Sequence, residues 1–222
     1  MLARRRDSGS MPKGAIDDVA RVLWPVSRER GHAATLRPAY AWRIAIPEVV
    51  VHVTVEIEPI ADELPAVSYR WDEDTAILTA QIASPVTGEG LSGSVDIEGT
   101  DGSWLVLDVA RGRLQGVEVA VWPDVRTRRQ LAPPADVADA RLSIPARGTP
   151  NAEGISALEV ETPLAAEADD SERVIYFRVG RRREVRTVRV ASDVLLDLDP
   201  QQHIAGLWLL NVPPSPTSRA AP

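Results

Sequence analysis

The sequence has no cysteine, one phenylalanine, three histidines and a single lysine, Lys13. The lack of cysteine excludes disulfides, thiolate metal sites and cysteine nucleophiles. The histidines (His32, His52 and His203) lie far apart in the chain, so they provide little material for a metal site, and we expect no cofactor. No apolar stretch reaches the roughly 18 residues that a membrane helix requires. No apolar core follows the N-terminal arginines, as it would in a signal peptide. We therefore predict a cytoplasmic protein with no membrane partner.

The remaining composition is typical of a globular protein. The 222 residues are 44% hydrophobic and 26% charged, which excludes a collagenous or wholly disordered chain. This length suits one large domain or two small ones. Eighteen prolines and fourteen glycines divide the chain into many short elements.

Charge is distributed unevenly along the chain, whose formal net charge is −7. Between Glu48 and Asp108 there are thirteen acidic residues, and Arg70 is the only basic one. Between Arg173 and Arg189 the balance reverses, with seven arginines and one acid. The negative net charge and the scarcity of aromatic residues near the basic run argue against a nucleic-acid partner.

The two ends of the chain differ from its middle. Residues 1–11 are predicted to be a disordered tail, and translation starts at either Met1 or Met11. Residues 12–40 are predicted to hold one helix and a connector, since apolar residues recur at helical spacing after Pro12 and stop before Pro25. The proline-rich segment 213–222 is predicted to be a second disordered tail.

Beyond Pro25 the apolar pattern changes to a period of two, which is typical of strands. Three pairs of blocks resemble each other in the same order: 43–47 with 141–145, 55–60 with 158–164, and 105–119 with 194–209. We therefore predict an internal duplication, with β repeat unit 1 at 41–122, a linker at 123–139 and β repeat unit 2 at 140–212. The expected fold is mainly β: two related antiparallel meander units packed side by side, with one N-terminal helix.

The third pair of blocks predicts two equivalent hairpins. In each, an apolar strand ends near an aspartate, Asp108 or Asp197, and the returning strand opens with a glycine, Gly116 or Gly206. We expect Asp108 and Asp197 to occupy equivalent positions when 41–122 is superposed on 139–212, each closing the same hairpin.

Segment 197–210 (Asp-Leu-Asp-Pro-Gln-Gln-His-Ile-Ala-Gly-Leu-Trp-Leu-Leu) resembles the C-terminal signature of a family of small prokaryotic domains, "domain of unknown function twenty-two eighty-three". Segment 108–119 is similar, with a shorter turn. Segment 69–82 resembles the family's earlier signature of a tyrosine, an acidic turn and an alternating apolar strand. It departs from that signature at Arg70 and Trp71, where an aspartate usually follows the tyrosine. The resemblance implies a small β-rich unit and implies no activity.

Motifs that would indicate catalysis or nucleotide binding are missing. The sequence contains neither Gly-x-Ser-x-Gly nor Gly-Lys followed by Ser or Thr. Two pairs of aspartates leave open whether the chain binds a cation: Asp72 with Asp74, and Asp197 with Asp199. For both pairs a turn is the competing interpretation, because aspartate commonly forms turns.

The arginine-rich segment provides the candidate binding residues: Arg178, Arg181, Arg182, Arg183 and Arg186. We expect Arg181, Arg182 and Arg183 to lie exposed in the turn after Gly180 and to contribute little to stability. Guanidinium groups repel one another unless anions lie nearby. The anions are expected either on the acidic first half of the chain or on another protein with an acidic surface. A solvated strand surface without a partner is the simplest alternative.

These observations favour a non-catalytic protein-interaction or scaffold module. The alternative is a small-ligand or metal-binding β protein with its site between the two repeats, and an enzyme of unknown class is third. The oligomeric state is left open.

Overall fold

The computed structural model describes residues 52–146 and 156–215, and these fold into fourteen strands without a helix. The prediction of a mainly β fold is confirmed. The predicted helix within 12–40 and the predicted tail 1–11 lie outside the described residues. Of the second predicted tail, residues 213–215 are described: Pro213 and Ser215 are half-buried and Pro214 is exposed.

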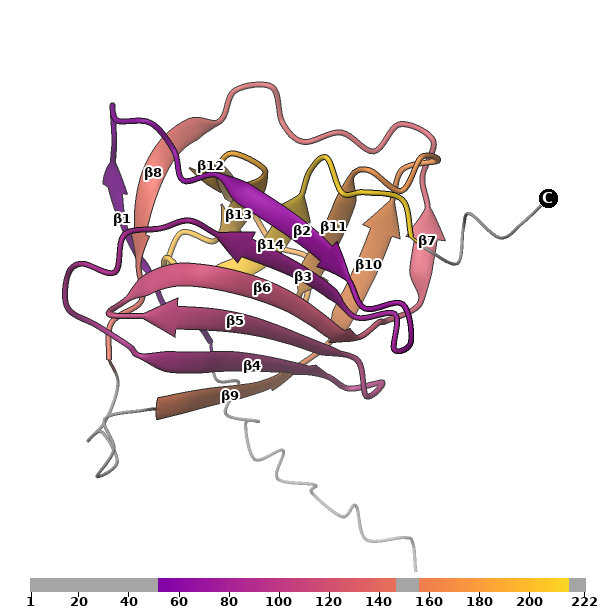
Figure 1. The fold of residues 1–222 in the computed structure, drawn as a ribbon, viewed down its shortest axis with the longest axis horizontal. Coiled ribbons are helices and arrows are strands. Elements are labelled where there is room, and N and C mark those ends of the chain that lie inside the picture. The colour runs from indigo at the N-terminus through magenta and orange to yellow at the C-terminus, as the bar shows by residue number, and fades with distance from the viewer. Residues whose placement is uncertain (1–51, 147–155, 216–222) are drawn as a thin grey trace, which may run out of the picture. The chain divides into compact units, whose positions relative to one another are not determined.

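Six strands form the first sheet, in the order β2-β3-β6-β5-β4-β9. Figure 1 shows β9, from the second half of the chain, beside β4 at the edge of this sheet. The strands are β2 (Val67–Trp71), β3 (Leu78–Ile82), β4 (Gly93–Gly99), β5 (Trp104–Ala110), β6 (Arg113–Val121) and β9 (Ser156–Thr162).

Eight strands form the second sheet, in the order β1-β8-β12-β13-β14-β11-β10-β7. The strands are β1 (Glu56–Pro59), β7 (Val125–Thr127), β8 (Ala138–Ser143), β10 (Leu164–Ala168), β11 (Ile175–Val179), β12 (Arg186–Ala191), β13 (Val194–Leu198) and β14 (Ile204–Leu209).

The alternating pattern of the sequence determines which face of each strand is buried. In β5, Leu105 and Leu107 are buried, whereas Trp104 and Asp108 on the opposite face are exposed. Side chains of both sheets belong to one hydrophobic cluster, to which β5 contributes Leu107 and β11 contributes Phe177. The two sheets therefore share a core.

Strands β13 and β14 depart from this pattern because both of their faces are buried. Their second face forms a smaller cluster in which Leu195 and Trp208 pack with Leu131, from the segment after β7. A continuous apolar run such as Val194 to Leu196 is typical of a strand covered on both sides.

The two predicted hairpins have matching registers. Asp108 on β5 pairs with Gly116 on β6, and Asp197 on β13 pairs with Gly206 on β14. In both hairpins the register shifts directly after the aspartate. Asp108 and Asp197 thus hold corresponding positions within their own hairpins, each paired with the glycine of the returning strand. The duplication itself stays a prediction.

The sheets are mixed, so the expectation of purely antiparallel units is wrong. Parallel pairs join β4 to β9, β12 to β8 and β10 to β7. Parallel neighbours need long connections, and β7, β8 and β9 all lie in the stretch between the two predicted hairpin regions. Strand β7 lies inside the segment 123–139 that we expected to be a linker. The alternation within a strand predicts its buried face but does not predict its partner.

Candidate functional site

Four of the five predicted arginines line one hollow of about 200 Å³ beside the eight-stranded sheet. Arg178 lies on β11, and Gly180, with φ of +78°, turns the chain directly after this strand. Arg181, Arg182 and Arg183 follow in the loop that leads to β12. Arg128 and Glu167 also line the hollow, together with Tyr176, Val185 and Ala205.

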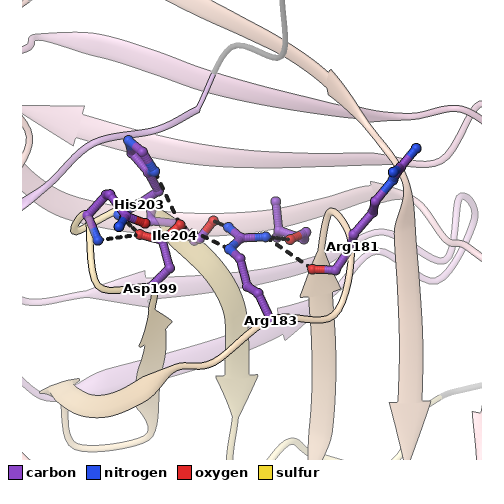
Figure 2. A network of polar contacts seen from close by, with 7 residues as sticks. Arg181, Arg183, Asp199, His203 and Ile204 are labelled. Atoms are coloured by element: carbon purple, nitrogen blue, oxygen red, sulfur yellow. Dashed lines mark hydrogen bonds and ion pairs between the residues drawn. The ribbon is translucent and has the colours of Figure 1, made fainter. Parts of the chain in front are cut away.

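The guanidinium group of Arg183, a half-buried residue, forms hydrogen bonds with neighbouring parts of the chain. Its Nε donates to the carboxylate of Asp199 at 3.0 Å, and its Nη2 donates to the carbonyl of Ile204 at 2.9 Å. Its Nη1 donates to the carbonyls of Val179 and Arg181 at 3.0 and 3.2 Å. Figure 2 shows Arg183 directed at Asp199, while the side chain of Arg181 extends away from it. The expectation that Arg183 is an exposed surface charge is therefore wrong.

Asp199 organises the turn between β13 and β14 from a nearly buried position. Its carboxylate accepts hydrogen bonds from the backbone N–H groups of Gln201 and His203, and it lies 3.2 Å from Nδ1 of His203. Burial raises the pKa of Asp199. The hydrogen bond from the His203 backbone, the nearby His203 ring and the Arg183 guanidinium group together outweigh this effect, so the pKa falls below its usual value. The Asp199 carboxylate thus acts as the counter-ion of Arg183.

The segment before β1 packs on the same turn. Val55 donates its N–H to the carbonyl of Gln202, and Ile204 donates to the carbonyl of Val53. The rings of His52 and His203 stack with centroids 4.7 Å apart. Burial and the proximity of His203 and of the Arg183 guanidinium group lower the pKa of His52. The surface of the β13–β14 turn at His203 is therefore covered by residues 52–55 of the chain itself.

Arg186 lies at the start of β12 and does not line the hollow. Its Nη2 donates to the side-chain carbonyl of Gln202 at 2.7 Å. The sequence groups Arg186 with the other four arginines, but the structure separates it from them.

Arg178, Arg181 and Arg182 provide the available positive charge of the hollow. Arg181 and Arg182 are exposed, and within residues 52–146 and 156–215 no acidic side chain forms an ion pair with any of the three. The Nε of Arg178 is buried and has no hydrogen-bond partner in this part of the chain. Arg128, by contrast, forms an ion pair with Glu167 at 2.9 Å. The hollow therefore has an excess of guanidinium groups that lack acceptors.

Sequence reasoning missed Arg128, Glu167 and Tyr176, which complete the hollow. Arg128 follows the short strand β7, and Glu167 and Tyr176 face each other on β10 and β11. The alternation of β10 and β11 could have indicated that Glu167 shares a face with Tyr176. No sequence signal could have indicated Arg128, because it reaches the hollow through the parallel pairing of β7 with β10.

The four aspartates considered for cation binding already have hydrogen-bond donors or lie exposed. The Asp197 carboxylate accepts from Thr187 at 2.6 Å and from Trp208 Nε1 at 3.2 Å, while Asp199 accepts from Arg183. Asp72 accepts from the backbone N–H groups at 74 and 75, as in an Asx turn, and these bonds lower its pKa. No group of three or more metal-ligating side chains occurs in residues 52–146 and 156–215.

A separate cavity has a volume of about 430 Å³. Residues from both halves of the chain line it. Ile82 and Leu114 from the first half and Leu142 and Val190 from the second form its apolar part, and Arg113 lies at its polar part. Arg113 donates to the carbonyls of residues 87 and 142. This cavity is where the alternative hypothesis would place a small ligand.

The sequence matches no protein-family model, and no curated protein is similar to it in sequence. The likeness to the family named above therefore stays a prediction. Across the described part of the chain, no helix has the length and apolar character needed to cross a membrane.

Proposed function

We propose that the protein is a non-catalytic interaction module that binds an acidic segment of a partner protein in the arginine-lined hollow. The proposal is supported above all by the convergence of Arg178, Arg181 and Arg182 without acidic partners in the described residues. Guanidinium groups form paired hydrogen bonds with carboxylates, and they remain charged at every cellular pH.

The distribution of ion pairs supports an external partner over the acidic first half of the same chain. The arginines that form ion pairs within residues 52–146 and 156–215 are Arg128, Arg141, Arg183 and Arg189. Their acceptors are Glu58, Asp62, Asp139, Glu167 and Asp199. None of these pairs involves Arg178, Arg181 or Arg182.

The size of the hollow suits one or two carboxylate side chains at a time. Its volume of about 200 Å³ is below the range of typical drug-sized ligand pockets. Val185 is 40% exposed and lines the hollow, so that it offers apolar contact to the stem of a glutamate. A short acidic peptide that lies across the loop 180–185 would neutralise several arginines at once.

The proposal is tested with labelled hexaglutamate as the probe and hexalysine as the opposite-charge control, by fluorescence anisotropy on the whole chain. We expect saturable binding of hexaglutamate that weakens as salt rises from about 0.05 to about 0.3 M. Arg181→Gln combined with Arg182→Gln should weaken binding by at least about tenfold, or about 1.4 kcal/mol.

The matched control removes the same charge elsewhere, by combining Arg70→Gln with Arg173→Gln, both at exposed positions. Binding by this variant should stay within about twofold of the original. Equal weakening in the two double variants would show that only net charge matters and would contradict the proposal. Absence of saturable binding would contradict it as well.

A further inference from the structure

A second recess uses residues other than the arginines. It is a groove of about 440 Å³ lined by two tryptophans, by apolar side chains of β7 and β11, and by residues on the polar rim. Its principal lining residues are Trp71, Trp122, Val125, Ile175, Glu172 and Ser215.

The two tryptophan rings are fixed in place by stacking and by hydrogen bonds. Trp71 and Trp122 stack with centroids 5.7 Å apart and an angle of 18° between their planes. Trp122 also packs against Phe177, and its indole N–H donates to the carbonyl of Ala76 at 2.9 Å. Both rings are half-buried, so part of each remains at the surface. The result is a rigid aromatic floor.

A proline-rich segment of the chain itself reaches the groove at Ser215. The N–H of Val212, which is fully buried, donates to the carbonyl of Arg173 at 3.1 Å. The indole N–H of Trp71 donates to the carbonyl of Pro213 at 2.9 Å. Pro214 follows, and Ser215 lines the groove. A tryptophan of this groove thus already binds a proline carbonyl.

Polyproline II segments dock in grooves that aromatic side chains line. Because the two indole N–H groups already bind Pro213 and Ala76, such a segment would pack on the tryptophan ring faces. Such segments have no internal hydrogen bonds, so their carbonyls are available, and their prolines lose little entropy on binding. Proline rings pack well on flat aromatic side chains. Glu172, which is exposed at the rim, would pair with a basic residue of such a segment.

We propose that this groove binds a proline-rich peptide of a partner protein, in the polyproline II conformation and carrying a basic residue. The peptide lies on Trp122 and beside Ser215, and its basic residue pairs with Glu172. Val125, which is 43% exposed on β7, extends the apolar surface under the peptide.

The test uses the whole chain and the labelled peptide Pro-Pro-Ser-Pro-Pro-Ser-Pro-Arg, with fluorescence anisotropy as the readout. The control peptide has alanine in place of each proline and the same charge. The groove is filled by Thr127→Trp, since Thr127 is an exposed lining residue. The matched variant Gln81→Trp adds the same side chain at an exposed position of β3.

We expect saturable binding of the proline peptide, and binding at least about tenfold weaker for the alanine peptide and for Thr127→Trp. Gln81→Trp should bind within about twofold of the original. Circular dichroism of the variants confirms that they are folded. Equal binding of the two peptides, or an unchanged affinity in Thr127→Trp, would overturn the proposal. If the proline peptide bound only after removal of residues 216–222, the groove would belong to the chain's own C-terminal segment. That result would contradict the proposal of a peptide from a partner protein. Neither result bears on the arginine-lined hollow.

Discussion

Arg182 and Arg183 are neighbours in the sequence, yet the fold uses their guanidinium groups differently. Arg182 is exposed at the hollow, whereas Arg183 donates to Asp199 and to three backbone carbonyls. Asp199 is nearly buried, so loss of Arg183 would leave its charge without its main partner. Breaking such a pair is costly, because the remaining charge stays away from water.

We therefore expect Arg183→Gln to lower the free energy of unfolding by about 2–3 kcal/mol. Arg182→Gln removes the same charge from the same loop and should change it by less than about 0.5 kcal/mol. Urea unfolding followed by tryptophan fluorescence measures both values. Similar values for the two variants would show that the bonds of Arg183 contribute nothing to stability.

At the scale of strands, the two hairpins β5–β6 and β13–β14 have the same register but different surroundings. A Cβ on Gly206 would lie 2.7 Å from the ring of Tyr176 and 3.0 Å from the carbonyl of Phe177. The Tyr176 ring packs on Trp208, so it cannot easily move aside. A Cβ on Gly116 would instead meet the carboxylate of Asp108 at 3.1 Å, and this side chain is exposed and able to shift.

We expect Gly206→Ala to destabilise the protein by about 1–3 kcal/mol, as overpacking does. Gly116→Ala should change the free energy of unfolding by less than about 1 kcal/mol, since the gain in chain entropy offsets the small displacement. Thermal unfolding of the two variants tests this difference. A larger loss for Gly116→Ala would contradict the account of the two hairpins.

The same elements show how far the sequence predicts the fold. The period of two along 105–119 predicts the strands β5 and β6 and their buried faces, and the likeness of 194–209 to this segment predicts a second hairpin. The period could not predict that β9 joins β4, because parallel pairing depends on contacts between segments far apart in the chain. The arginines of 178–183 were identifiable by composition alone. Their division into a half-buried Arg183 that pairs with Asp199 and an exposed Arg182 depends on the position of Asp199, which the sequence does not specify.

At the scale of the whole molecule, the described residues include one acidic strand pair and one arginine-rich hollow. The outward-facing positions of β4 and β9 hold Asp96 beside Glu159 and Glu98 beside Glu161. Like charges in neighbouring strands destabilise a sheet slightly and keep its surface hydrated. The hollow beside the other sheet has the opposite sign. This difference in charge favours an oriented encounter with a charged partner, since complementary charge accelerates association.

The central claim is that Arg178, Arg181 and Arg182 bind carboxylates together. Nuclear magnetic resonance of the arginine Nε–H groups in the whole chain, during titration with hexaglutamate, tests it most directly. We predict that the signals of these three arginines shift together and saturate, and that those of Arg70 and Arg186 do not move. Shifts of similar size at Arg70 and Arg186, or an unchanged Arg178 signal, would contradict the claim.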